Sequence, residues 1–145
     1  MAKKYQLNAA LRLANRSMGR MISWGLAPAG YHLLTVTGRK SGNRYSTPVA
    51  LIEENGNRWL VAPYGEVSWV LNARAAGEVT LTRGRTSQIF RIDEVGAQEA
   101  APVLRTYIQK ERVVRPYFDC EPDAPLQDFM AEASRHPVFS LIPVP

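Results

Sequence analysis

Acidic residues are missing from the first part of this chain. None occurs before Glu53, whereas eight lysines and arginines lie there. The remaining 93 residues carry ten basic and thirteen acidic side chains, so the net charge of +5 combines +8 in the first 52 residues with −3 in the rest. We therefore expect one end of the molecule to be a positive field. Such a field suits a polyanionic cofactor, an anionic membrane surface or nucleic acid, and charge alone does not choose among them.

Cysteine and histidine are also scarce. The single cysteine, Cys120, excludes an intrachain disulfide and is compatible with a reducing cytosol. The two histidines, His32 and His136, form no Cys/His set with metal-binding spacing, so no metal site is predicted and a Ser-His-Asp hydrolase has little support. We interpret His136, which precedes Pro137, as a helix-end or structural histidine rather than a general base.

Long hydrophobic runs and nucleotide-binding motifs are absent as well. No run reaches the roughly 18 apolar residues of a membrane-spanning helix. No G-x-G-x-x-G opens a helix after a strand and no G-x-x-x-x-G-K-[ST] occurs, which argues against Rossmann and P-loop proteins. With 145 residues, 46% of them hydrophobic, the sequence predicts one soluble, cytoplasmic domain over residues 1–145, of which 1–30 are a helix and a basic arm.

The N-terminal part has the pattern of an amphipathic basic helix. Apolar residues recur at three- and four-residue steps from 5 to about 25, and Arg12, Arg16 and Arg20 form a separate row. One interpretation is a helix that packs on the core with a solvated arginine face. The alternative is peripheral contact with an anionic membrane, at its inner face, through Met21, Ile22 and Trp24.

Strand patterns dominate the middle of the chain. Asn55-Gly56 and Arg83-Gly84-Arg85 are typical of tight hairpins, and Gly77 is expected to end a short helix over 67–76. Helices are predicted at 98–112 and 126–134, and residues 136–142 are expected to return as a last strand. The predicted fold class is mixed α+β, an antiparallel β-barrel with flanking helices. Its earlier strands are expected at 32–37, 45–53, 58–63, 79–83 and 87–95.

A basic, glycine-flanked turn lies between the first two predicted strands. In Gly38-Arg39-Lys40-Ser41-Gly42-Asn43-Arg44, two glycines let the backbone approach a ligand and three cations supply charge-assisted donors. Consecutive peptide N–H groups there can form an anion-binding nest. The turn therefore predicts an anion cradle, although exposed hairpin tips carry the same residue types simply as solvated turns.

Three segments together resemble a known family. Thr35-Val36-Thr37-Gly38-Arg39-Lys40-Ser41-Gly42, then Thr47-Pro48-Val49, then Trp69-x-x-Asn72-x-Arg74-Ala75 resemble the actinobacterial deazaflavin-dependent nitroreductases. The resemblance runs from about Leu33 to Thr82 and weakens after Gly96. It implies a split β-barrel of the FMN-binding type that binds coenzyme F420. That cofactor carries a phosphodiester and a polyglutamate tail, which suits the acid-free, basic half of the chain.

The resemblance also implies the residues that would hold the cofactor. Arg39, Lys40 and Ser41 would bind the phosphate with Arg44 nearby, and strand residues would run beneath the deazaflavin. The end of the third strand would present backbone groups to the ring edge, and the start of the following helix would close the site. The remaining cofactor-binding residues implied are Tyr45, Ser46, Thr47, Pro48, Val49, Ala50, Val61, Ala62, Pro63, Tyr64, Ser68, Trp69, Val70, Leu71 and Asn72. If their role is purely structural, Trp69 and Asn72 would instead be helix residues that anchor a barrel mouth.

Two positions affect the expected chemistry. Pro63 and Tyr64 stand where the nitroreductases have a small hydroxyl residue and a lysine, which removes a donor and a charge beside the ring and argues against nitro-prodrug activation. Tyr117 is the best match for the family's tyrosine over the substrate pocket, and its phenol can donate a proton to an acceptor oxygen. As a plain core residue it would only pack, as is expected of Tyr107.

The sequence thus favours an enzyme in which reduced deazaflavin passes hydride to an electron-poor small molecule. The candidate acceptors are enones, quinones and nitroaromatics, with the enones preferred. The closest rival is a flavin reductase that uses FMN on the same barrel, which needs fewer positive charges. The other is a non-enzymatic module for anionic lipid or nucleic acid. Nucleic acid is not expected as a partner, because Trp24, Tyr31 and Tyr45 are too scattered among the basic residues. The oligomeric state stays open.

Overall fold

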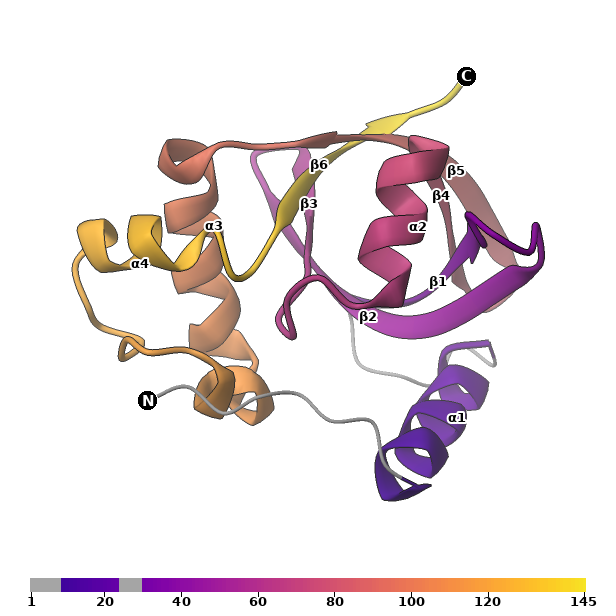
Figure 1. The fold of residues 1–145 in the computed structure, drawn as a ribbon, viewed down its shortest axis with the longest axis horizontal. Helices are drawn as coiled ribbons and strands as arrows, with labels where there is room; N and C mark the ends of the chain where they lie inside the picture. Colours follow the sequence, from indigo (N-terminus) through magenta and orange to yellow (C-terminus); the bar gives the residue numbers. More distant parts are fainter. Residues whose placement is uncertain (1–8, 24–29) are drawn as a thin grey trace.

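A six-stranded antiparallel barrel forms the centre of the molecule (Figure 1). The computed structural model describes residues 9–23 and 30–145. The barrel is closed in the order β1-β2-β3-β6-β5-β4, and β4 pairs with β1 to complete it. The predicted antiparallel barrel is confirmed. Its strands are β1 (Tyr31–Thr37), β2 (Arg44–Glu54), β3 (Asn57–Val61), β4 (Glu78–Arg83), β5 (Thr86–Glu94) and β6 (Val138–Pro143).

Tight turns set the order of the strands. Asn55 and Gly56 both have positive φ, 52° and 80°, which is the backbone that a two-residue hairpin needs between β2 and β3. Gly84, at φ 58°, turns β4 into β5. The last strand, β6, pairs with both β3 and β5 and so fills the gap that the hairpins leave. The predicted turns and the returning strand are therefore confirmed.

Helix α2 (Ser68–Ala76) closes one end of the barrel. Val70 and Ala73 are fully buried and pack with the inward-facing residues of the strands, and Trp69 packs against the same core. Gly77 ends the helix at φ 76°, and its N–H donates to the carbonyl of Ala73 at 2.8 Å. The helix ends at Gly77 as predicted, because only glycine adopts this backbone without strain.

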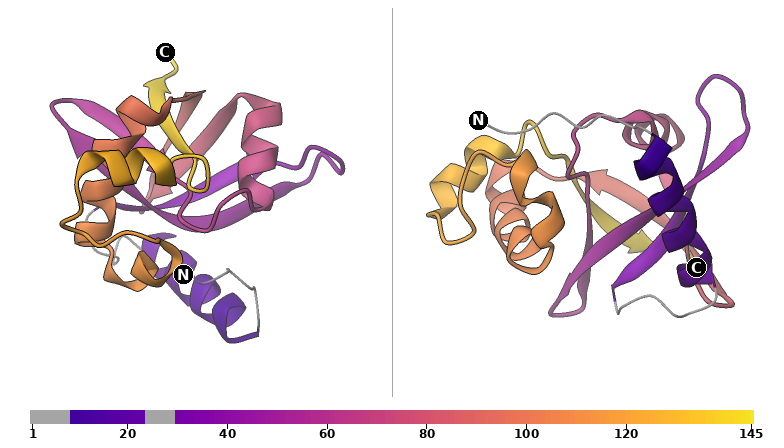
Figure 2. Two further views of the ribbon diagram at one scale, coloured as in Figure 1. Left: turned by 60° about the vertical axis from the view of Figure 1, so that its left-hand side comes forward. Right: turned by 90° about the horizontal axis from the view of Figure 1, so that it is seen from below.

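A second layer of helices covers one side of the barrel. It consists of α3 (Ala97–Lys110), the 3₁₀ helix η1 (Arg112–Tyr117) and α4 (Leu126–Glu132), which lie together in both views of Figure 2. Their apolar faces bury the outward-facing side chains of Ala50, Ile52 and Val61. Tyr107 is buried in this layer, as expected of a packing residue.

Helix α1 (Ala9–Ser23) lies below β1 and β2 in Figure 1. The predicted helix began at residue 5 and ended at about residue 25. Its residues 5–8, 24 and 25, which include Trp24, lie outside the described residues. Arg16 and Arg20 are exposed, while Met18 and Gly19 are half-buried, which fits a helix that packs on the barrel with a solvated basic face. Among the described residues, no helix is long and apolar enough to span a membrane.

Candidate functional site

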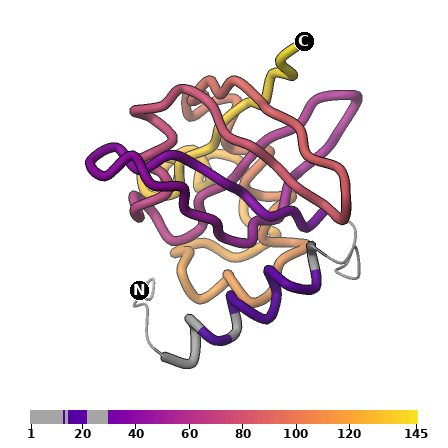
Figure 3. Tube along the Cα trace, turned by 90° about the vertical axis from the view of Figure 1, so that its right-hand side faces the viewer, coloured from indigo at the N-terminus to yellow at the C-terminus, as the bar shows by residue number. Residues whose placement is uncertain are grey.

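The barrel topology brings the predicted cofactor residues to one end of the barrel. The turn between β1 and β2, the start of β2 and the end of β3 all lie at the end that α2 closes, since β1 and β2 run antiparallel and β3 ends beside the middle of β2. Figure 3 shows the β1–β2 turn projecting beyond the barrel. Arg39 of the turn and Asn72 of α2, 33 residues apart in the chain, are thus neighbours in space.

The β1–β2 turn (residues 38–43) is held in one shape by its own hydrogen bonds. The N–H of Gly38 donates to the Asn43 carbonyl at 2.7 Å, and the N–H of Gly42 donates to the Gly38 carbonyl at 3.0 Å. A Cβ on Gly38 would lie 2.6 Å from the Tyr45 ring, so only glycine fits beneath that ring. The N–H of Asn43 is bound to Ser41 Oγ at 3.1 Å. These three amides are therefore used within the turn itself.

Arg39 ties the turn to α2. Its backbone N–H and its Nη1 both donate to Asn72 Oδ1, at 3.0 and 2.7 Å. Asn72 is only 5% exposed, so the amide holds Arg39 from within the protein. Asn72 therefore anchors the mouth of the barrel, which was the structural alternative for this residue. The bond also orients the turn toward the start of α2.

Lys40 and Arg44 supply the accessible charge of the turn. Both are exposed, and neither forms an ion pair with any described residue. Ser41 is exposed as well, and its hydroxyl lies 3.0 Å from the hydroxyl of Tyr45. Two unpaired cations beside two hydroxyls form a donor set that suits a phosphate or a carboxylate.

The other predicted cofactor residues divide by burial. Ser46, Thr47 and Pro48 on β2 and Ser68 on α2 are exposed or half-buried, so their side chains can meet a ligand. Val49 and Val70 belong to the barrel core, so only their backbone groups can do so. The same holds for fully or nearly fully buried Ala50, Val61, Ala62 and Pro63, while Leu71 and Trp69 are half-buried.

Tyr64 and Tyr117 meet where the end of β3 passes η1. Their rings pack edge to face with centroids 4.9 Å apart and planes at 78°. Both side chains are half-buried. The sequence assigned to Tyr64 only its backbone, whereas the structure makes its ring the direct neighbour of the predicted proton donor, Tyr117.

A third tyrosine near this pair was not predicted from the sequence. Tyr31, the first residue of β1, donates its hydroxyl to Glu111 Oε2 at 2.6 Å. Burial, followed by this hydrogen bond, raises the pKa of Tyr31 well above its usual value. The phenol therefore stays protonated at neutral pH. No local pattern signals this contact, because 80 residues separate the partners.

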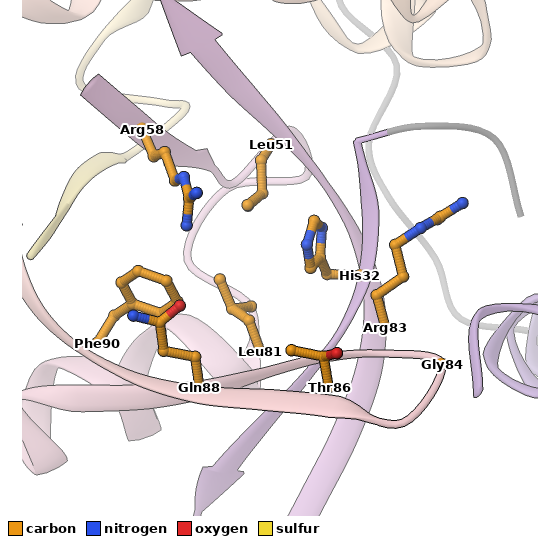
Figure 4. Close-up of a pocket in the computed structure, with 9 residues that line it drawn as sticks. All are labelled: His32, Leu51, Arg58, Leu81, Arg83, Gly84, Thr86, Gln88 and Phe90. Atoms are coloured by element: carbon orange, nitrogen blue, oxygen red, sulfur yellow. The ribbon is translucent and has the colours of Figure 1, made fainter. Parts of the chain in front are cut away.

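Two cavities lie elsewhere on the barrel. One of about 440 Å³ occupies the end opposite α2, where His32, Arg58 and Gln88 surround a floor of Leu81 and Phe90 (Figure 4). A second, of about 390 Å³, runs along β1, β4 and β5, and Arg44 is the one predicted site residue that lines either cavity. The other predicted cofactor residues do not line these two cavities. No cluster of metal-ligating side chains occurs in the described parts of the chain, residues 9–23 and 30–145.

A comparison with known protein families identifies an F420H(2)-dependent reductase. The family model for F420H(2)-dependent quinone reductase matches residues 7–117, which include the basic turn, α2 and Tyr117. No curated protein matches the chain. Among solved structures, an F420-H2 dependent reductase, FDR-A, is 24% identical over 78% of this chain and 94% of its own, with a TM-score of 0.53.

Two further solved structures share the fold. A domain-swapped dimer is 19% identical over 92% of this chain and 99% of its own, with a TM-score of 0.55. A protein of unknown function from Agrobacterium tumefaciens is 16% identical over 97% of this chain and 58% of its own, with a TM-score of 0.58. These likenesses support the fold, a split β-barrel as predicted.

Proposed function

Because the chain belongs to the F420H(2)-dependent quinone reductase family, we propose that its acceptor is a quinone. The chain is an F420-dependent oxidoreductase on the evidence of a family match that covers more than two thirds of its length. The sequence favoured an enone among three acceptors. The family moves that preference to a quinone, whose two carbonyl oxygens also take up negative charge as the ring is reduced.

The donor set of the β1–β2 turn fits the acidic part of the cofactor. Lys40 and Arg44 are exposed and without ion pairs among the described residues, and Ser41 adds a hydroxyl. Arg39 holds the turn against α2 through Asn72 and keeps further guanidinium N–H groups that can bind a phosphate oxygen. We assign the phosphate and tail of F420 to these four residues, and the ring to the face between Ser46, Pro63 and the start of α2.

Tyr117 is the residue we assign to proton transfer. When bound, the reduced deazaflavin would supply a hydride, and a quinone that accepts it needs one proton to become the hydroquinone. The ring of Tyr117 packs edge to face against the ring of Tyr64. A phenol so placed donates a hydrogen bond to the quinone oxygen and can release its proton there as charge develops. Solvent then restores the phenol.

A fluorescence titration of the protein with F420 and with FMN, at low and high salt, tests this function. We expect tighter binding of F420, because its tail carboxylates add contacts to the basic turn that the single phosphate of FMN does not make. The affinity should fall with salt, since exposed charges are screened over about 8 Å at physiological ionic strength. Equal affinity for FMN, or an affinity independent of salt, would contradict the proposed role of the turn. Oxidation of F420H2 with a soluble benzoquinone then tests the acceptor.

A further inference from the structure

The two histidines of the chain have different surroundings. His32 lies at the open end of the barrel, half-buried, with Nδ1 3.1 Å from the carbonyl oxygen of Gly30. His136 is 4% exposed and follows α4. Its Nδ1 lies 2.7 Å from the carbonyl oxygen of Pro63, and its Nε2 lies 3.1 Å from Glu132 Oε2. Only His136 therefore joins a carbonyl to a carboxylate.

The contacts of His136 determine where its protons are. A carbonyl oxygen only accepts, so Nδ1 must carry a hydrogen. Nε2 and Glu132 Oε2 are both buried, and neither meets another hydrogen-bond partner in the described part of the chain. If neither atom held a proton, two lone pairs would face each other at 3.1 Å without water, which is costly. One proton must therefore lie between them, on the imidazole or on the carboxyl.

Other charged groups surround the pair and limit its protonation. Glu132 Oε1 accepts the N–H of Asp119 at 2.7 Å and lies 3.2 Å from Arg135 Nη2. Burial lowers the pKa of His136, and the neighbouring Glu132 opposes that shift. Burial, then Glu132 and Asp128, raise the pKa of Cys120 to about 11, so that thiol stays neutral. Two donors on Oε1 and one shared proton on Oε2 leave the buried pair itself with no net charge.

His136 also contacts both segments of the proposed site. It binds the Pro63 carbonyl, one residue before Tyr64. The ring of Phe118, the residue after Tyr117, stacks on the ring of His136. The ring centroids are 3.8 Å apart and the planes are at 10°. The residues on either side of His136 also pack on the segment around Pro63 and Tyr64. A Cβ on Gly65 would lie 3.3 Å from the Arg135 carbonyl, and Ala62 donates its N–H to Pro137 at 2.8 Å.

We propose that Glu132 and His136 share one buried proton and act together as a positioning pair that fixes the Pro63–Tyr64 turn against Tyr117. The pair touches neither the cofactor nor the acceptor. It holds the segment that presents the ring edge of the site and, through Phe118, the segment that carries the phenol. The positioning role rests on the proposed function, whereas the shared proton does not.

NMR of the free protein, with ¹⁵N-labelled histidine, tests the shared proton. We expect a slowly exchanging proton on Nδ1 of His136, and imidazole shifts that stay constant from about pH 6 to pH 8, because the pair titrates as a unit. Glu132→Gln supplies a neutral donor to Nε2, so Nε2 of this variant should have the shift of a plain acceptor. Free titration of His136 in the wild-type protein near pH 6.5, the value of an unperturbed imidazole, would overturn the shared proton.

Binding of F420 to variants tests the positioning role. Glu132→Ala leaves Nε2 without a partner, so we expect roughly a 10-fold loss of affinity, the equivalent of one net hydrogen bond. Glu132→Gln should restore wild-type affinity, because it keeps both contacts of the side chain. The matched control is His32→Asn, which removes the other histidine and should change nothing. Wild-type affinity in a folded Glu132→Ala protein would overturn the role.

The two measurements separate this inference from the proposed function. If the wild-type protein did not bind F420 at all, the proposed function and the positioning role would both fail. The NMR result on His136 would still decide the shared proton, since it requires no cofactor. Melting temperatures of the three variants identify any loss of affinity that comes from unfolding alone.

Discussion

The basic turn at residues 38–44 and the aromatic region formed by the Tyr64–Tyr117 contact and the Phe118–His136 stack are built differently. The turn is exposed, continuous in sequence and held mostly by its own backbone. The aromatic region is partly or fully buried and joins three segments that lie more than 15 residues apart in the chain. The turn contributes positive charge for the cofactor, and the aromatic region holds the Tyr117 ring in place.

This difference has a physical basis. Charge acts over several ångströms in water and depends little on the orientation of a long side chain, so an exposed basic turn works with few constraints. Proton donation needs heavy atoms within about 3 Å, which requires groups that packing holds in place. We therefore expect substitutions in the turn to weaken binding, and loss of the Tyr117 hydroxyl to slow turnover at nearly unchanged binding.

Removal of the turn's charge should have the largest effect. Replacement of Arg39 and Lys40 together by alanine should weaken F420 binding by a few kcal/mol, since a hydrogen bond to a charged group contributes on the order of 1.5–3 kcal/mol. Fluorescence titration measures this loss. Arg85→Ala is the matched control, because Arg85 is an exposed arginine in the hairpin at the other end of the barrel. Wild-type affinity in the double variant would show that the turn is ordinary solvated surface.

Tyr117→Phe should separate turnover from binding. The variant keeps the ring and its edge contact with Tyr64 but loses the hydroxyl. Turnover should fall by roughly 10- to 1,000-fold, within the general range of acid catalysis, while the affinity for F420 hardly moves. The measurement is steady-state oxidation of F420H2 with a quinone and, separately, with cyclohexenone. Unchanged rates with both would make Tyr117 a packing residue. A loss with the enone alone would indicate that the hydroquinone takes its proton from solvent.

Asn72→Ala tests the link between the turn and α2. Loss of the buried amide leaves two donors of Arg39 without their acceptor, so the free energy of unfolding should fall by about 1–3 kcal/mol. Binding of F420 should weaken as well, by less than in the double variant, because Lys40 is untouched. Urea denaturation and the same titration measure both effects. Exposed Asn57 provides the control Asn57→Ala. Unchanged cofactor affinity in Asn72→Ala would show that the turn needs no anchor.

The smallest effect should come from Tyr31→Phe, as a change in the pH dependence of stability at high pH. The pKa values of Tyr31 and Tyr107 are raised in the folded protein, so both phenols keep their protons when the unfolded chain loses them near pH 10. The folded state then binds more protons, and stability falls as the pH rises above about 10. Without the Tyr31 hydroxyl this fall should be shallower. Urea midpoints at pH 8 and pH 10.5 measure it, and equal slopes for both proteins would contradict the assignment.

Local sequence patterns predicted most of the fold. Asn55, Gly56 and Gly77 have positive φ, and the alternation of strand residues fixes which face of each strand is inward. The turns and strands are therefore determined by residues that are close together in the sequence. The family resemblance also carried the candidate site, since its turn, strand and helix motifs are each continuous in the chain. The pattern does not show that the turn itself uses the amides of Gly38, Gly42 and Asn43.

The sequence by itself determined the barrel class and, through its motifs, the identity of the cofactor. Only the tertiary structure decided that Asn72 holds Arg39, that the ring of Tyr64 packs on Tyr117, and that His136 joins Pro63 to Glu132. Charge and backbone preference are properties of single residues and short segments. Burial, ring contacts and a shared proton depend on groups from distant parts of the chain, which only the closed barrel brings within a few ångströms of each other.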